Sequence, residues 1–215
     1  MPQDLTHGHQ MTEETMNIGS LARKLVAEQS DGRMIVAIAG PPGSGKSTLS
    51  ANLAAELGEL CCIIPMDGFH LDNETLQARG LLSVKGAPET FFRQGFERLI
   101  NDLRAGDAHH FPTFDRDIDS VVENGGTVPK TASILLVEGN YLLFDEPGWR
   151  DLAQKWDASI WLDVPEKILE DRLIQRWLDQ GMPRDAAIAR AQGNDLVNAQ
   201  RVLQKALPAT WVIPH

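Results

Sequence analysis

The chain has 215 residues, of which 42% are hydrophobic and 23% are charged. This composition is typical of a folded α/β domain and excludes a disordered, low-complexity chain. The formal net charge of −10 disfavours a nucleic-acid partner, because proteins that bind the phosphate backbone usually present a basic surface.

Three further features of the sequence bear on where the protein works. No apolar run approaches the ~18 residues that span a bilayer, so we expect no membrane partner. The first basic residue is Arg23, so the N-terminus lacks the positive start of a signal peptide. Cys61 and Cys62 are adjacent within an apolar run and are expected to be reduced thiols. These features predict a cytoplasmic protein.

The domain organisation that the sequence predicts is simple. Residues 1–12 are polar and are expected to form a disordered tail, with residues 13–215 as a single domain. A first helix is predicted over residues 12–28. Its expected apolar face carries Ile18, Leu21, Leu25 and Val26.

Helical and apolar segments then alternate along the chain. Apolar runs predict strands, buried as in a parallel sheet, at residues 34–39, 60–65, 134–137 and 159–164, with a short last strand at 211–213. Helices are predicted over residues 46–57, 71–79, 90–104 and 165–179, and over most of 183–207. Gly125-Gly126 lies between two short extended pieces and is predicted to be a hairpin turn. The alternation predicts a mainly parallel sheet covered by helices on both faces.

The segment Gly-Pro-Pro-Gly-Ser-Gly-Lys-Ser-Thr at residues 40–48 satisfies the P-loop pattern G-x-x-x-x-G-K-[ST]. Glycines let the backbone turn tightly and bring N–H groups close to phosphate oxygens, and the following helix aims its N-terminus at the same anion. Lys46 can reach the β- and γ-phosphates, and Ser47 can ligate Mg²⁺. The expected nucleotide-binding residues are Gly40, Gly43, Ser44, Gly45, Lys46, Ser47 and Thr48. The fold class is therefore predicted to be a P-loop NTPase α/β/α sandwich.

Acidic residues lie at the ends of three of the predicted strands, at the edge where open parallel sheets bind ligands, and one of them, Asp163, is expected to have only a structural role. Asp67 follows the second strand and is a candidate base for an attacking hydroxyl, although an Asp there could instead cap a turn. Glu138 closes the strand Ile-Leu-Leu-Val and is a candidate to hold Mg²⁺, against the alternative of a simple strand-end acid.

The last third of the chain is predicted to form a helical lid. Arg172 and Arg176 share one helix face and could stabilise the transferred phosphoryl group. The alternative is a solvated face with acidic salt partners. Asn194, Asp195 and Asn198 also share a face, which is spaced to meet a lid or adenine or is merely solvated.

Several motifs resemble those of the phosphoribulokinase/uridine kinase family, which includes bacterial pantothenate kinases. They are Met66-Asp67-Gly68-Phe69-His70, the stretch from Leu76 to Leu82 with Lys85-Gly86-Ala87-Pro88-Glu89, Pro112-Thr113-Phe114-Asp115-Arg116, and Glu138-Gly139-Asn140-Tyr141. The likeness is strongest to a bacterial subgroup described as fructose-transport-system kinases. The resemblance implies ATP as donor, Asp67 as base and Glu138 near Mg²⁺. It also implies His70, Asp115, Arg116 and Asn140 around the acceptor, with Arg172 and Arg176 near the phosphates.

These observations favour an ATP-dependent kinase that phosphorylates a hydroxyl of a small metabolite such as a sugar, a nucleoside or a pantothenate-like compound. The alternative is a nucleotide-dependent regulatory ATPase or switch without a small-molecule acceptor. Many relatives form dimers, so the resemblance leaves a homodimer open.

Overall fold

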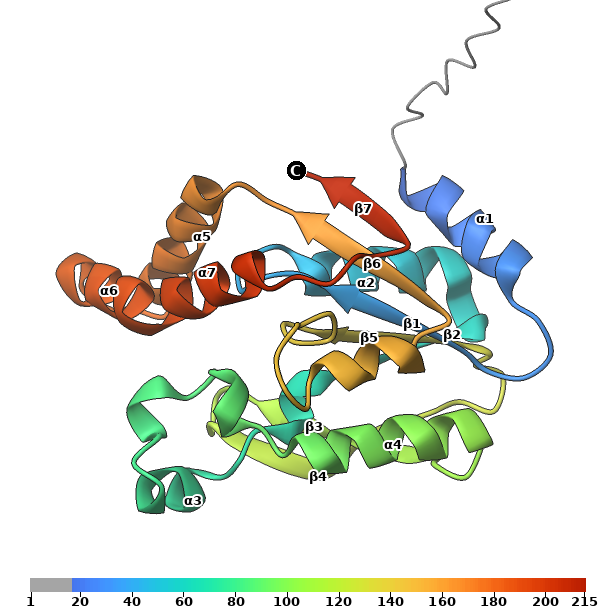
Figure 1. Ribbon diagram of the computed structural model, residues 1–215, viewed down its shortest axis with the longest axis horizontal. Helices are drawn as coiled ribbons and strands as arrows, with labels where there is room; N and C mark the ends of the chain where they lie inside the picture. Colours follow the sequence, from blue (N-terminus) through green and yellow to red (C-terminus); the bar gives the residue numbers. More distant parts are fainter. Residues whose placement is uncertain (1–16) are drawn as a thin grey trace, which may run out of the picture.

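The computed structural model describes residues 17–215, in which a central sheet lies between two layers of helices (Figure 1). The sheet consists of five parallel strands in the order β2-β5-β1-β6-β7. Its strands are β1 (Met34–Ala39), β2 (Cys61–Pro65), β5 (Ile134–Gly139), β6 (Ala158–Asp163) and β7 (Trp211–Pro214). The predicted three-layer α/β/α sandwich with a mainly parallel sheet is confirmed.

Each face of the sheet has its own hydrophobic core. On one face, β1 and β6 pack against α1 (Ile18–Glu28) and α2 (Lys46–Leu57). On the other face, β2 and β5 pack against α4 (Arg93–Ala105) and the short helix η5 (Arg150–Lys155). β1 is buried along its whole length, as its continuous apolar sequence predicted.

Some sequence-based expectations about the edges of this core were wrong. β2 lies at the edge of the sheet and alternates half-buried and buried residues, so Cys61 is only half-buried. Val26 is 47% exposed because the inward face of α1 is formed by Leu21, Ala22 and Leu25. Residues 12–16 of the predicted first helix, and the tail at 1–12, lie outside the described residues.

A separate antiparallel hairpin, β3 (His110–Asp115) with β4 (Ser120–Thr127), lies beside α3 (Asn73–Ala78) and α4 (Figure 1). The predicted turn at Gly125-Gly126 was wrong, because both glycines lie within β4. Their missing side chains make room for the partner strand. A Cβ at Gly125 would lie 2.0 Å from Thr113 Oγ1, and one at Gly126 would lie 2.1 Å from the Phe111 ring. These glycines therefore allow close packing rather than a turn.

The helices after β6 form a group at the carboxyl edge of the sheet (Figure 1). They are α5 (Glu166–Asp179), α6 (Arg184–Arg190) and α7 (Leu196–Gln204), with one π-helical segment, Ala191–Asp195, between the last two. The predicted helix over 183–207 is thus interrupted by a wider turn. Single π turns inside helices often occur at functional sites.

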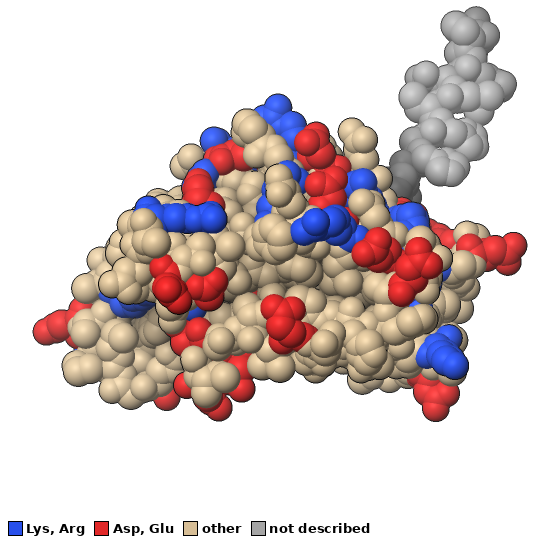
Figure 2. Space-filling model, turned by 90° about the horizontal axis from the view of Figure 1, so that it is seen from below, with Lys and Arg blue, Asp and Glu red and all other residues tan. Residues whose placement is uncertain are grey.

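Charges on the face of the hairpin and α4 are mixed. Figure 2 shows Lys and Arg side chains interspersed with Asp and Glu on this face, without a continuous basic tract. A bilayer-spanning helix would need to be longer and more apolar than any helix within residues 17–215.

Candidate active site

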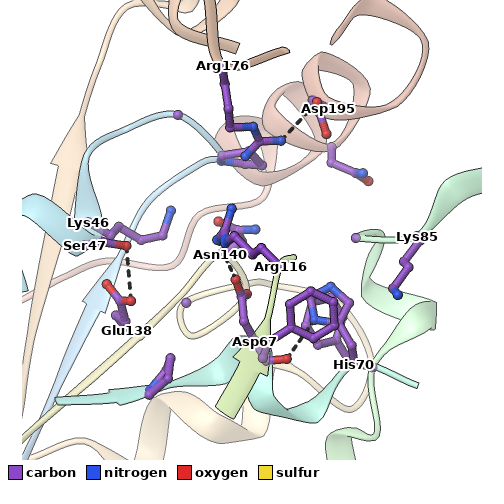
Figure 3. Close-up of a pocket in the computed structure, with 18 of the residues that line it drawn as sticks. Lys46, Ser47, Asp67, His70, Lys85, Arg116, Glu138, Asn140, Arg176 and Asp195 are labelled. Atoms are coloured by element: carbon purple, nitrogen blue, oxygen red, sulfur yellow. Dashed lines mark hydrogen bonds and ion pairs between the residues drawn. The ribbon is translucent and has the colours of Figure 1, made fainter. Parts of the chain in front are cut away.

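A cavity of about 710 Å³ opens at the carboxyl edge of the sheet, where the loops after β1, β2 and β5 meet the hairpin and the helices α5–α7 (Figure 3). The parallel register explains the meeting point, because Glu138 in β5 lies opposite both Pro65 in β2 and Ile38 in β1. Of the predicted site residues, the cavity is lined by Gly43, Gly45, Lys46, Ser47, Thr48, Asp67, His70, Arg116, Glu138, Asn140 and Arg176.

The P-loop connects β1 to α2 and forms one wall of this cavity. Gly45 caps α2 in a left-handed conformation with φ of 96°, which favours glycine. The N–H groups in the first turn of an α-helix have no acceptor within the helix. Because α2 begins at Lys46, these donors suit the oxygens of a bound phosphate.

The ammonium group of Lys46 is folded back onto the loop. Its Nζ donates to the carbonyl oxygens of Gly40 at 3.0 Å and Pro41 at 2.9 Å. Desolvation lowers the pKa of Lys46 to about 8, against the attraction of Asp67 and Glu138. A phosphate group would provide the strong anionic partner that this ammonium does not have here.

Ser47 and Glu138 lie together in the lining of the cavity. Ser47 Oγ donates to Glu138 Oε1 at 3.1 Å, and Ser50 Oγ donates to Glu138 Oε2 at 3.2 Å. Among residues 17–215 there is no cluster of three or more His, Cys, Asp or Glu side chains suited to a metal ion. One carboxylate and one hydroxyl fit Mg²⁺, which usually keeps several waters and binds together with substrate phosphates.

Asp67 lies in a short 3₁₀ turn, Met66–Phe69, directly after β2. Its Oδ2 accepts a hydrogen bond from Arg116 Nη2 at 3.0 Å, which ties the end of β2 to the hairpin (Figure 3). Asn140, after β5, lies near this pair at the same wall. The carboxylate of Asp67 is therefore not a turn cap, because its hydrogen bond goes to a side chain 49 residues away in sequence.

His70 lies between two aromatic rings. Its ring centroid is 4.1 Å from that of Phe91 and 4.7 Å from that of Phe114, and its Nδ1 is 2.8 Å from the carbonyl oxygen of Asp67. Burial lowers the pKa of His70 below its ordinary value, although the nearby Asp67 opposes the shift. The packed imidazole of His70 therefore supports the turn that carries Asp67.

Arg176 projects from α5 toward the cavity (Figure 3). Its Nη2 donates to Asp195 Oδ2 at 3.2 Å, and Trp177 Nε1 donates to the same oxygen at 2.6 Å. The Nε atom of Arg176 is buried and has no hydrogen-bond partner within the described residues. Asn194, Asp195 and Asn198 are all buried, so the alternative of a solvated polar face was wrong for them.

The structure does not bring Asp115 or Arg172 into this cavity. Asp115 Oδ1 accepts the backbone N–H groups of Asp117 and Ile118, so this carboxylate shapes the hairpin turn. Arg172 Nη1 instead donates to the carbonyl oxygens of Gly43 and Ser44, each at 3.3 Å. Arg172 lines a shallower hollow on the other side of the P-loop, with Thr48 and Ser44.

The sequence-based predictions gave no site role to several polar or aromatic residues that line the cavity, among them Lys85, Asp119, Trp177 and Arg190. Lys85 Nζ pairs with Asp119 Oδ1 at 2.8 Å, which joins the loop after α3 to the tip of the hairpin. The sequence contained one hint of a site role for Lys85, because it is the only Lys between residues 47 and 129. The pairing itself brings together segments that no local pattern connects.

The chain is similar to known proteins of one kinase family. A family model described as the phosphoribulokinase/uridine kinase family matches residues 35–191. Escherichia coli YggC is 39% identical over 84% of this chain and 77% of its own length, and "Putative uridine kinase C227.14" of Schizosaccharomyces pombe is 37% identical over 77% and 76%.

A solved structure resembles this one over almost its full length. The "putative fructose transport system kinase" of Silicibacter sp. TM1040 is 49% identical, with a TM-score of 0.88 over 92% of this chain and 98% of that one. With its P-loop, its parallel strand order and the match over residues 35–191, this chain belongs to the phosphoribulokinase/uridine kinase family.

Proposed function

We propose that this protein is an ATP-dependent kinase that transfers the γ-phosphoryl group to a hydroxyl of a small metabolite. The observation that carries the proposal is that one cavity holds the P-loop, the Ser47–Glu138 pair and the carboxylate of Asp67. A P-loop alone would serve any nucleotide-binding protein. A carboxylate facing the same space provides the proton acceptor that transfer to an alcohol needs.

Each end of the cavity has a distinct part in this proposal. The P-loop N–H groups and Lys46 bind the phosphates, while Ser47 and Glu138 hold Mg²⁺. Bound Mg²⁺ would neutralise the charge that develops on the phosphates. Asp67 accepts the proton of the acceptor hydroxyl, and Arg176 stabilises charge on the transferred group. Catalysis then rests mainly on positioning and electrostatics.

The residues expected around the acceptor divide into two groups in this proposal. His70 supports the turn of Asp67, and Arg116 and Asn140 contact the acceptor directly. Asp115 contributes by shaping the turn on which Arg116 stands, and Arg172 supports the P-loop from its outer side. A cytoplasmic location is part of the proposal.

The test is a screen for ADP release over sugars, nucleosides, pantothenate and hydroxy acids, with Asp67→Asn as the control. Stimulation of ADP release by one acceptor, together with its phosphorylated product in a mass spectrum, would support a kinase. Slow ATP hydrolysis that no metabolite changes would instead support a nucleotide-dependent regulatory ATPase.

A further inference from the structure

Arg116 contacts the carboxylate of Asp67, and both residues line the cavity. Its Nη2 bond to Asp67 Oδ2, 3.0 Å long, is the one hydrogen bond that its side chain makes within residues 17–215. The Arg116 side chain is 60% exposed and lines the cavity, while that of Asp67 is 32% exposed. A guanidinium has five N–H donors, so most of the donors of Arg116 remain available to a bound molecule.

Either member of the Asp67–Arg116 ion pair can readily be replaced by another hydrogen-bond partner. Ion pairs with this much exposure contribute little to stability, since water replaces the partner at low cost. An acceptor hydroxyl that is to hydrogen-bond to Asp67 must approach the carboxylate that Arg116 now contacts. If the hydroxyl takes the Asp67 oxygen that Arg116 now contacts, the guanidinium is free to bind an anionic group of the acceptor.

Lys85 differs from Arg116, because its ammonium is already saturated. Its three donors meet Asp119 Oδ1 at 2.8 Å, Asn73 Oδ1 at 2.8 Å and the Asp119 carbonyl oxygen at 3.2 Å. Asp119 neutralises its charge. Lys85 therefore fixes the tip of the hairpin, and with it the turn that carries Arg116, rather than binding the acceptor itself.

Arg190 is a cation that faces the same space and has no acidic partner among residues 17–215. Arg190 of α6 lines the cavity, donates to the Ser83 carbonyl oxygen at 3.4 Å and lies 5.2 Å from the centre of the Trp177 ring. It makes no ion pair with a carboxylate in the described part of the chain. We define the acceptor end of the cavity as Asp67, Lys85, Arg116, Asp119 and Arg190. This end carries three cations and two carboxylates.

The aromatic rings at this end are already packed against one another. His70 lies against Phe91 and Phe114, and Lys85 Nζ lies 5.0 Å from the centre of the Phe114 ring. These contacts hold the rings against one another in the cavity wall. The acceptor end offers a ligand charged groups and hydrogen-bonding groups.

We infer that the acceptor is a hydroxy acid, with a carboxylate close to the hydroxyl that is phosphorylated, and that Arg116 is the residue that selects it. The inference rests on the proposed kinase function. Arg116 exchanges Asp67 for the carboxylate of the acceptor, and a planar guanidinium suits a planar carboxylate through two parallel hydrogen bonds. The hydroxyl of the acceptor takes the place of Arg116 on Asp67.

The reaction then balances without a further reactant. A bond forms between the hydroxyl oxygen and the γ-phosphorus, and the bond from this phosphorus to the bridging oxygen of ATP breaks, releasing ADP. The hydroxyl proton goes to Asp67. The carboxylate of the acceptor is unchanged and keeps its contact with Arg116.

The test compares acceptors that differ only in charge. The pairs are D-glycerate with glycerol and D-gluconate with D-glucitol, in each of which a CH2OH group replaces the carboxylate, with uridine as a further neutral compound. For the pair that the enzyme uses, we expect the acid to have a kcat/KM ~100-fold higher than the neutral member, because the neutral member leaves Arg116 unpaired.

Two variants of Arg116 test whether this residue causes the preference for the acid over the neutral acceptor. Arg116→Gln is expected to abolish the preference for the acid by raising its KM, with the KM for ATP unchanged, and Arg116→Lys is expected to keep part of it. Arg98→Gln is the matched control, since Arg98 is exposed on α4 and does not line the cavity. It should leave the preference unchanged.

The outcomes separate this inference from the function on which it rests. Faster phosphorylation of a neutral member, or a preference for the acid that survives in Arg116→Gln, would overturn the inference and leave the kinase proposal standing. The first of these needs no variant, so a folding defect in Arg116→Gln does not affect it. If no compound of either charge stimulates ADP release, both the inference and the kinase proposal are wrong.

Discussion

Ser47 Oγ lies 3.1 Å from Glu138 Oε1, which joins the first turn of α2 to the end of β5 across 91 residues of sequence. These two side chains are the oxygen ligands that the proposed Mg²⁺ site takes from the chain. We expect Glu138→Gln to raise the Mg²⁺ concentration needed for half-maximal activity by ~10–100-fold, because the amide has no charge to offer the metal.

Calorimetry gives this prediction a readout independent of turnover. ADP binding should strengthen when Mg²⁺ is added to the wild type and strengthen less in Glu138→Gln. Glu56→Gln removes the same charge from an exposed site on α2 and is the control. Equal Mg²⁺ dependence in both variants would exclude Glu138 from the metal site.

Asp67 is predicted to matter for turnover rather than for nucleotide binding. Asp67→Asn keeps the shape of the side chain and can still contact Arg116, but it cannot accept a proton. We expect kcat to fall by ~10²–10⁴ with ATP affinity nearly unchanged. Single-turnover rates and ATP titrations measure the two quantities separately. Turnover equal to that of the wild type would rule out Asp67 as the base.

Asp195 is predicted to position Arg176. The carboxylate is buried and holds both Arg176 Nη2 and Trp177 Nε1. We expect Asp195→Asn to lower kcat by ~10-fold in the wild-type background and to add little in an Arg176→Ala background, because residues that act together are not additive. The measurement is a double-mutant cycle on kcat. Additive effects would show that Asp195 acts independently of Arg176.

The sequence predicted the P-loop wall of the site well because the pattern is local. The strand at 34–39 and the helix at 46–57 have the predicted bounds, and the glycine spacing determines the turn between them. Asp67 and Glu138 could be placed for a similar reason. The carboxyl ends of parallel strands meet at one edge, so acids that follow β2 and β5 are expected near the P-loop.

The part of the cavity formed by the hairpin and the loop after α3 could not be predicted in this way, because long-range packing determines it. Gly125-Gly126 has the composition of a turn, and only the side chains of the facing strand explain why glycine is needed inside β4. The Lys85–Asp119 pair joins the loop after α3 to the hairpin tip. Asp119 has a positive φ of 50°, which is unusual outside glycine and is fixed by this tertiary contact.

Gly68 is predicted to be essential for docking the hairpin against the turn that carries Asp67. A Cβ at this position would lie 2.0 Å from the backbone oxygen of Pro112 in β3. Since backbone cannot move aside easily, we expect Gly68→Ala to lower the free energy of unfolding by about 1–3 kcal/mol. Urea unfolding followed by circular dichroism measures this loss.

Gly19→Ala is the matched control for this substitution. Gly19 lies in α1, and the nearest atom to its added Cβ would be Arg23 Nη1 at 3.5 Å, an ordinary contact. Alanine favours helix, so we expect a gain of about 0.5–1 kcal/mol there. If the two alanine variants were equally stable, the close approach of β3 to Gly68 would not be a real constraint.

Glu146 is predicted to give the protein an acid-sensitive part of its stability. It follows β5 and accepts hydrogen bonds from Arg201 Nε and Lys205 Nζ, each at 2.8 Å, which tie α7 to the core. The bond to Arg201, with help from Lys205, holds the pKa of Glu146 at about 2, below its ordinary value of 4.5. Because the folded pKa is the lower one, this stabilisation is present above pH 4.5 and is lost as the pH falls toward 2.

The variant Glu146→Gln isolates this contribution, because every other carboxylate is common to both proteins. Between pH 5 and pH 3, the free energy of unfolding of the wild type should fall by about 2 kcal/mol more than that of Glu146→Gln. Urea titrations at a series of pH values measure the difference. Parallel pH profiles for the two proteins would mean that the Glu146 contacts contribute no more to the folded state than an uncharged amide does.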